Sequence, residues 1–236
     1  MDTPTNLSRR EAIKTMVSSA LLCAAGINGF TNSQPAYAMG EAGIPQGVQK
    51  VEGDVTINGI PAKVGDIVAP DDVIVTGKDS SIVFVFGDSA CLMRENSKMV
   101  VKNSDKSAEP SKVINGLRLL DGKLLSVFGE GEKSVETPSA YIGIRGTGIY
   151  VESDHEKTYI CTCYGKVKIS YAHNLSKFES ISANYHESSR HVYRDGAIKR
   201  APMINHTDAE LIMLERFVNR LPPFAKSSEK RDGGGY

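Results

Sequence analysis

The feature that most constrains this chain is the stretch from Gly47 to Tyr171, in which short β-like runs alternate with Gly, Asp and Asn and helical spacing is absent. β-Branched and aromatic residues dominate these runs, as is typical of strands. Strands that recur at roughly ten-residue intervals predict an all-β sandwich, barrel or short solenoid. The clearest runs are 55–57, 72–76, 81–86 and 148–151.

Glycine-containing dipeptides mark the points where these strands are expected to turn. Asn58-Gly59 and Asp121-Gly122 each lie between apolar runs, which predicts two hairpins. Tyr164-Gly165 is expected to turn the chain after a strand over 157–163. The segment Arg145-Gly146-Thr147-Gly148 lacks the lysine and the helix of a phosphate loop, so its glycines are expected to permit tight bends between strands.

The first 38 residues have the pattern of an export signal. Arg9 and Arg10 precede a moderately apolar run, 16–27, which is too short and too polar to span a bilayer as a permanent helix. Ala36-Tyr37-Ala38 supplies a small-x-small cleavage pattern, so the mature chain is expected to begin at Met39. The segment around the two arginines resembles a twin-arginine signal, which implies export to the periplasm of a bacterium. The alternative is a cytoplasmic amphipathic helix with a chance arginine pair.

The charge balance limits the partners of the mature chain. The full sequence has 28 basic and 28 acidic residues, and removal of the signal leaves the chain almost neutral. This balance argues against nucleic acid as the main partner and against electrostatic attachment to membranes. No later stretch is long and apolar enough for a transmembrane helix, so the mature form is expected to be soluble, with no membrane span.

The part of the chain beyond residue 172 has a different pattern and is expected to form a C-terminal extension over 173–224. Thr207 and Glu210 have the spacing of a capping box, and Pro222-Pro223 ends the apolar pattern that follows it. An amphipathic helix is therefore expected over about 208–221, packed on the β module. Its apolar face consists of Leu211, Leu214, Phe217, Val218 and Leu221.

Two polar segments are expected to lie outside the packed structure. The segment 104–112 contains Pro110 and is expected to be a surface loop. The last residues, 225–236, include three consecutive glycines and carry too little apolar surface to fold, so they are expected to be disordered.

Several short pieces of the β region resemble the FecR-like domain family over about residues 47–172. The most specific are Thr137-Pro138-Ser139-Ala140 and Arg145-Gly146-Thr147, in that order. The resemblance implies an all-β, solenoid-like module outside the cytoplasm; founding members sense or relay iron–siderophore signals to a membrane-spanning regulator. The other matching pieces are 53–59, 64–67, 72–77, 86–89, 122–124 and 164–167.

The chain departs from that family at its N-terminus. Founding members carry a cytoplasmic anti-sigma segment and a transmembrane helix ahead of the module, whereas this chain has a cleavable signal in that place. The resemblance therefore implies the module alone. A chain whose N-terminal segment is a cleaved export peptide cannot itself transmit information across the membrane.

Cys161-Thr162-Cys163 is the most unusual local feature of the sequence. Strand alternation places Tyr159, Cys161 and Cys163 on one face. Two residues of extended chain separate the two Cα atoms by roughly 6.6 Å, at the upper limit for a disulfide, and both sulfurs point the same way. The pair could bind a soft metal ion with further ligands, pack as small apolar residues, or take part in redox chemistry.

Histidines that could complete a Cys/His site are concentrated in the C-terminal extension. His206 directly precedes the predicted helix cap, so its imidazole could fold back over the β module. Scattered histidines are more often surface residues, and spacing alone selects no set. The candidate metal ligands are Cys161, Cys163, His186, His191 and His206.

The sequence contains no nucleophile elbow, paired-acid signature or dinucleotide fingerprint. We therefore expect a non-enzymatic periplasmic binding or scaffold protein, whose partner is another periplasmic or envelope protein. The alternative is a metal-, haem- or redox-active protein centred on Cys161 and Cys163, with a transition metal or haem as the cofactor. The third cysteine of the mature chain, Cys91, leaves an odd count that permits at most one internal disulfide.

Overall fold

The computed structural model describes residues 38–39, 43–102 and 114–225. Nearly all of the predicted signal, the predicted loop 104–112 and residues 226–236 lie outside the described residues. Within the described residues, the bond at which we expect cleavage joins Ala38 to Met39, which pair with Gln46 and Pro45 as a short strand. No described helix is long and apolar enough to cross a membrane.

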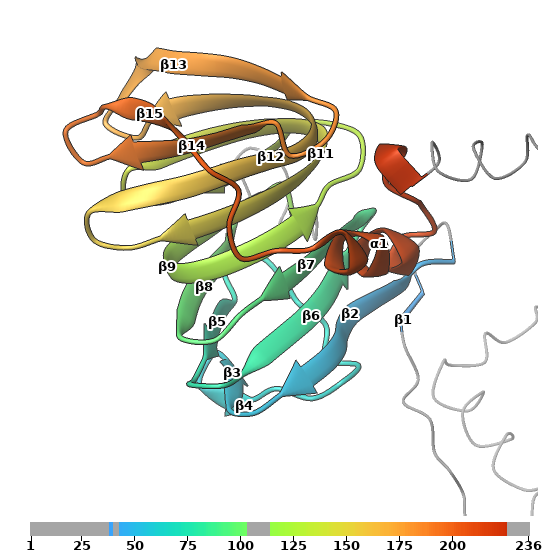
Figure 1. Ribbon diagram of the computed structural model, residues 1–236. Helices are drawn as coiled ribbons and strands as arrows, with labels where there is room; N and C mark the ends of the chain where they lie inside the picture. Colours follow the sequence, from blue (N-terminus) through green and yellow to red (C-terminus); the bar gives the residue numbers. More distant parts are fainter. Residues whose placement is uncertain (1–37, 40–42, 103–113, 226–236) are drawn as a thin grey trace, which may run out of the picture. The chain divides into compact units, whose positions relative to one another are not determined.

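The described chain is mainly β, with a helix near its C-terminal end, which confirms the predicted fold class (Figure 1). All its strands belong to one branched, hydrogen-bonded sheet. The elements are β1 (Ala38–Met39), β2 (Pro45–Glu52), β3 (Val55–Ile57), β4 (Ile60–Pro61), β5 (Val73–Thr76), β6 (Ser81–Phe86), β7 (Ser89–Met93), β8 (Ser97–Lys102), β9 (Gly116–Val127), β10 (Lys133–Glu136), β11 (Ala140–Ser153), β12 (Lys157–Tyr171), β13 (Asn174–Ala183), β14 (Ser188–Tyr193), β15 (Ile198–Ala201) and α1 (Asp208–Phe217).

Strand β9 joins the earlier strands to the later ones. Its first half pairs with β8 and β10, and its second half pairs with β7 and β11. The two halves meet at Gly122, whose φ is 98°, just after a register shift against β8 between Leu119 and Asp121. A Cβ at this position would lie 2.1 Å from Oγ of Ser97, so only glycine fits. Asp121-Gly122 is thus a bend within one strand, and the predicted hairpin is wrong there.

Of the other glycine-containing dipeptides, some are turns as predicted and some lie within strands. Asn58-Gly59 is the tight turn between β3 and β4, as predicted, with φ values of 53° and 79°. Tyr164-Gly165 is not a turn, because β12 continues through it to Tyr171. Gly146 lies inside β11, where the register against β12 shifts between Arg145 and Gly148. The predicted bend between strands is therefore a bulge within a strand, in which Gly146 adopts left-handed backbone with φ of 57°.

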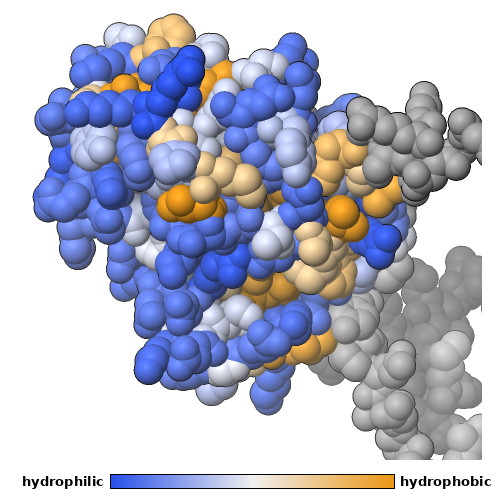
Figure 2. Space-filling view, in the orientation of Figure 1, coloured by the Kyte–Doolittle hydropathy of each residue, from blue (hydrophilic) through white to orange (hydrophobic). Residues whose placement is uncertain are grey.

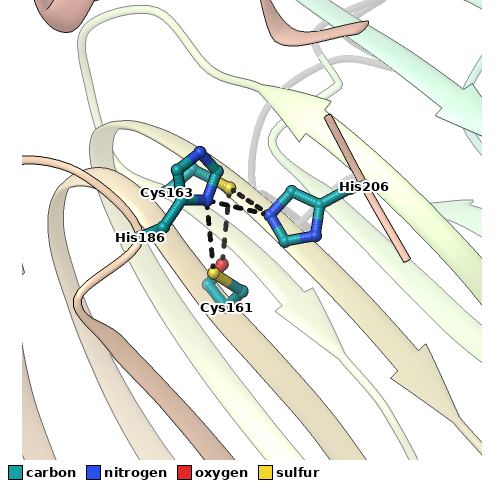
Figure 3. Close-up of side chains that lie close together, drawn as sticks. All are labelled: Cys161, Cys163, His186 and His206. Atoms are coloured by element: carbon teal, nitrogen blue, oxygen red, sulfur yellow. Dashed lines mark hydrogen bonds between the residues drawn. The ribbon is translucent and has the colours of Figure 1, made fainter. Parts of the chain in front are cut away.

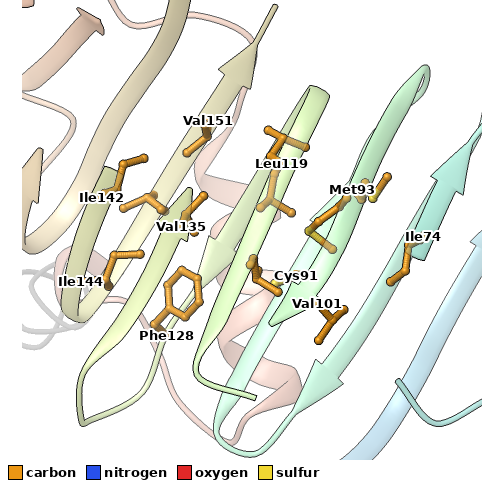
Figure 4. Close-up of a cluster of buried hydrophobic side chains, with 14 of the residues drawn as sticks. Ile74, Cys91, Met93, Val101, Leu119, Phe128, Val135, Ile142, Ile144 and Val151 are labelled. Carbon is orange, nitrogen blue, oxygen red and sulfur yellow. The ribbon is translucent and has the colours of Figure 1, made fainter. Parts of the chain in front are cut away.

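Two clusters of buried apolar side chains stabilise the sheet. The first is mostly aliphatic, includes three buried phenylalanines, and extends from Ile74 through Leu119 to Ile142 (Figure 4). The second includes residues of β6, β7, β9, β11 and β12 and is covered by α1 through Leu211 and Leu214. The space-filling view shows a largely hydrophilic face, with hydrophobic residues in small patches, several of them beside α1 (Figure 2).

Helix α1 begins as the sequence predicts. The Thr207 hydroxyl accepts from the backbone N–H of Glu210, and the Glu210 side chain accepts from the backbone N–H of Thr207. The helix is shorter than predicted and ends at Phe217 rather than Leu221. Asn219 adopts left-handed backbone with φ of 57°, so the chain leaves the helix before it reaches the two prolines.

Three strands lie in the C-terminal extension, for which we predicted only a helix. β13 and β14 both pair with β12, on which β13 uses the end near Tyr171 and β14 the end near Lys157. β15 then pairs with β14. The long strand β12 thereby brings the C-terminal extension into the sheet and positions the candidate site.

Candidate metal centre

Cys161 and Cys163 lie side by side on β12 and face the second apolar cluster. Both are fully buried and are free thiols. Tyr159 joins them in that cluster, whereas Ile160 packs in the first. The predicted alternation of this strand is confirmed.

Two histidines of the extension lie over the two cysteines (Figure 3). His186 is in the turn between β13 and β14, with φ of 48°, and its backbone N–H donates to the Cys163 carbonyl over 2.9 Å. His206 directly precedes the α1 cap, is 5% exposed and stacks on Tyr150 at a centroid distance of 4.7 Å. The sheet and the helix cap thus fix both imidazoles.

The four donor atoms surround one point. Cys161 Sγ is 3.7 Å from His186 Nδ1, Cys163 Sγ is 3.3 Å from His206 Nε2, and the two ring nitrogens are 3.0 Å apart. All four atoms lie within 4.8 Å of one another. Zinc bonds of about 2.1 Å to nitrogen and about 2.3 Å to sulfur give tetrahedral edges of about 3.3 to 3.8 Å. The donors therefore have nearly the spacing of a tetrahedral site.

The outer nitrogen of each imidazole already has an acceptor. His206 Nδ1 lies 2.6 Å from the carbonyl oxygen of Ile204, and His186 Nε2 lies 3.1 Å from a carboxylate oxygen of Asp208. A carbonyl and an ionised carboxylate can only accept, so these outer nitrogens carry the protons. In the neutral rings the inner nitrogens then direct lone pairs toward each other and the thiols, an arrangement that a bound cation stabilises.

The cluster also favours a thiolate. The hydrogen bond from Cys163, followed by those from His186 and His206, lowers the pKa of Cys161 to about 3 against the effect of burial. Burial and the charge on Cys161 raise the pKa of Cys163. Burial alone would lower the pKa of His186, but its interactions with Cys161 and Asp208 raise it. Thiolate is the form in which cysteine ligates a metal ion, and imidazole ligates as the neutral ring.

Residues 72–168 match the family model described as FecR protein. This match covers less than half of the chain. Two crystal structures, at 1.65 and 2.50 Å, of a candidate anti-sigma factor from Parabacteroides distasonis ATCC 8503 are similar at 13% identity and a TM-score of 0.44. The alignment covers 55% of this chain and 59% of theirs. No curated protein matches the chain.

The stretch that matches the FecR model contributes only part of the cluster. Cys161 and Cys163 lie within the matched residues, whereas His186 and His206 follow them in the chain. The fifth predicted ligand, His191, is not in the group, because β14 aligns it with Tyr159 and places Ser189 opposite Cys161.

Sequence reasoning missed Asp208, which holds the outer nitrogen of His186. It is the first residue of α1, and its other carboxylate oxygen accepts from the Tyr185 hydroxyl at 2.8 Å. An acidic residue in the first turn of a helix is common for reasons of the helix dipole, so the sequence held no signal for this second role.

Proposed function

We propose that this chain is an exported, non-enzymatic FecR-domain protein that binds one soft transition-metal ion, zinc(II) or copper(I). The ligands are Cys161, Cys163, His186 and His206. The observation that carries the proposal is the convergence of four donor atoms within 4.8 Å, with both outer imidazole nitrogens already held by acceptors.

The donor set selects the class of metal. Thiolate and imidazole are the ligands of zinc and copper(I), whereas calcium and magnesium require oxygen. Four protein ligands fill a tetrahedral site and leave no open position for a substrate, which is typical of structural and binding sites rather than catalytic ones. Haem, the other cofactor predicted, needs one or two axial ligands and would leave the rest of this cluster unused.

The location belongs to the same proposal. The twin-arginine signal, with Arg9 and Arg10, directs the chain to the periplasm, where its partner is another envelope protein. That route carries folded proteins, so the metal ion can be bound before export. Replacing both arginines with lysine should hold the precursor in the cytoplasm, and the exported form should begin at Met39 by N-terminal sequencing. Undiminished export of the double variant would contradict this assignment.

Metal analysis of the exported protein tests the site. Protein purified from the periplasm without chelators should contain about one equivalent of zinc or copper by mass spectrometry of the elements. Cobalt(II), loaded after metal removal, should give a thiolate-to-metal charge-transfer band. The double substitution Cys161→Ser/Cys163→Ser should abolish both signals.

Cys91→Ser is the matched control, because it removes a thiol that is equally buried but lies outside the cluster. It should leave metal content unchanged. Mass spectrometry of the alkylated protein counts its free thiols and so distinguishes metal binding from the redox alternative. A protein with no metal and a Cys161–Cys163 disulfide would overturn the proposal. Equal metal loss in the control and in the double variant would overturn it too.

A further inference from the structure

A second feature, apart from the Cys/His cluster, is a hollow of about 490 Å³ on the solvent face of β11–β13. Its lining carries four cations and one carboxylate. In the described part of the chain no ion pair engages these cations, although Lys168 Nζ lies 3.9 Å above the ring of Phe178. The charged lining residues are Glu132, Lys133, Arg145, Lys166 and Lys168.

The arrangement of these cations opposes folding rather than supporting it. Arg145 and Lys166 are directly opposite each other on β11 and β12, and like charges in that position destabilise a sheet. Lys168 follows two residues along on the same face as Lys166. Elsewhere in the sheet the cations Lys102 and Arg118 share the carboxylate of Glu136, at 2.5 and 2.7 Å. Such pairing is missing from the described lining of the hollow.

Gly143 keeps the floor of the hollow open. It lies opposite Lys168, and its backbone does not have the positive φ that would require glycine. A Cβ there would be no closer than 3.9 Å to its neighbours, so a larger residue fits the strand. Glycine weakens a strand interior and commonly marks a place where another group approaches the backbone closely.

The shape of the hollow indicates the kind of ligand. Lys133 is half-buried, but the other three cations and the hydroxyls of Ser180 and Ser182 are exposed, unlike the enclosed polar groups of small-molecule pockets. Lys166 and Lys168 are separated by roughly 6.6 Å, which is also the repeat of side chains on one face of an extended peptide. The cationic area spans a few residues on neighbouring strands, too small for a membrane surface.

We propose that this hollow is the docking site for an acidic, extended segment of a partner protein, whose alternate carboxylates pair with Arg145, Lys166 and Lys168. The proposal is independent of metal binding. Electrostatic complementarity of this kind sets partner choice and association rate, and it weakens as salt screens the charges.

Fluorescence anisotropy of a labelled peptide in which glutamate alternates with serine tests the proposal. The full-length protein should bind it, and binding should weaken as sodium chloride is raised. Arg145→Ser/Lys166→Ser/Lys168→Ser should weaken binding at least about tenfold, the result of losing three charge contacts. The matched control Lys177→Ser/Lys199→Ser/Arg200→Ser removes the same charge from exposed positions elsewhere and should bind like the wild type.

Gly143→Phe fills the hollow without changing its charge and should weaken binding in the same direction, whereas Gly143→Ala should change it little. Circular dichroism confirms that each variant is folded. The proposal would be overturned if the Arg145→Ser/Lys166→Ser/Lys168→Ser variant bound the peptide like the wild type, or if the control variant lost as much affinity. It would also be overturned if a peptide with glutamine in place of glutamate bound equally well, or if the protein bound phosphatidylglycerol vesicles more tightly than the peptide.

Discussion

The two apolar clusters of this protein contain cysteines that are equally buried and chemically different. Cys91, in the first cluster, has the Ser126 hydroxyl beside it, and burial raises its pKa to about 12. Cys161 and Cys163, in the second, lie among imidazoles, and the pKa of Cys161 is about 3. All three are 0% exposed. Burial alone therefore does not make a cysteine structural; the neighbouring donors decide.

The second cluster also has a buried carboxylate packed beside it, contributed by α1. The Tyr164 hydroxyl donates to Glu215 of α1, and Arg220 binds the same carboxylate at 2.6 Å. Glu215 is nearly as buried as the leucines beside it. The carboxylate of Glu215 links the C-terminal end of α1 to β12, and His206 contacts β12 at the other end of the helix. These two contacts together fix the direction of the helix on the sheet.

Equivalent truncations in the two clusters should cost similar stability and differ in their effect on metal. Leu119→Ala and Leu214→Ala each remove a fully buried side chain and should each lower the free energy of unfolding by about 2–5 kcal/mol. Leu214→Ala should also lower metal affinity, because α1 carries Asp208 and follows His206. Urea unfolding and chelator competition measure the two effects. If the two variants bound metal with equal affinity, the second cluster would support the metal site no more than the first does.

A smaller change should separate the ligands from their support. Asp208→Asn removes the charge that holds His186 Nε2, so metal affinity should fall about 10–100-fold. Asp79→Asn, at an exposed turn, is the control and should leave affinity unchanged. An Asp208→Asn protein that binds metal like the wild type would show that the carboxylate serves only the helix.

The smallest expected effect concerns the helix cap. Thr207→Ala removes the hydroxyl that accepts from Glu210, and it should lower the free energy of unfolding by about 1 kcal/mol. Ser182→Ala, on the exposed face of β13, should change it little. Thermal unfolding of the metal-free proteins measures both. Chelator competition gives the metal affinity of the same variant. If Thr207→Ala lowered metal affinity more than Asp208→Asn does, the helix cap, rather than the carboxylate, would position the site.

Local signals explain what the sequence predicted of the fold. The turn at Asn58-Gly59 and the cap at Thr207 depend on neighbouring residues, and both were correct. Gly122 and Gly165 were misread as turns, because hairpin turns and strand bulges both use left-handed glycine. Strand β13 was missed since it buries only Ile181 and Ala183 and so shows almost no alternating pattern.

The candidate ligands were predictable as residue types and not as a set. His186 and His191 are only five residues apart in sequence, and the register of β14 places His191 opposite Tyr159, away from the cysteines. Asp208 could not be chosen, because its role depends on where the turn at His186 meets the helix. Register and docking are properties of the whole sheet.

The ligands also differ in where they come from along the chain. A protein with residues 72–168 alone would keep both thiols and lose both imidazoles, because His186 and His206 come later. If the proposed site binds metal, it does so only because this extension follows the matched stretch, and the fold of that stretch alone is not enough. Sequence surveys for such a site should therefore search for the two cysteines and the two downstream histidines jointly, rather than for the domain.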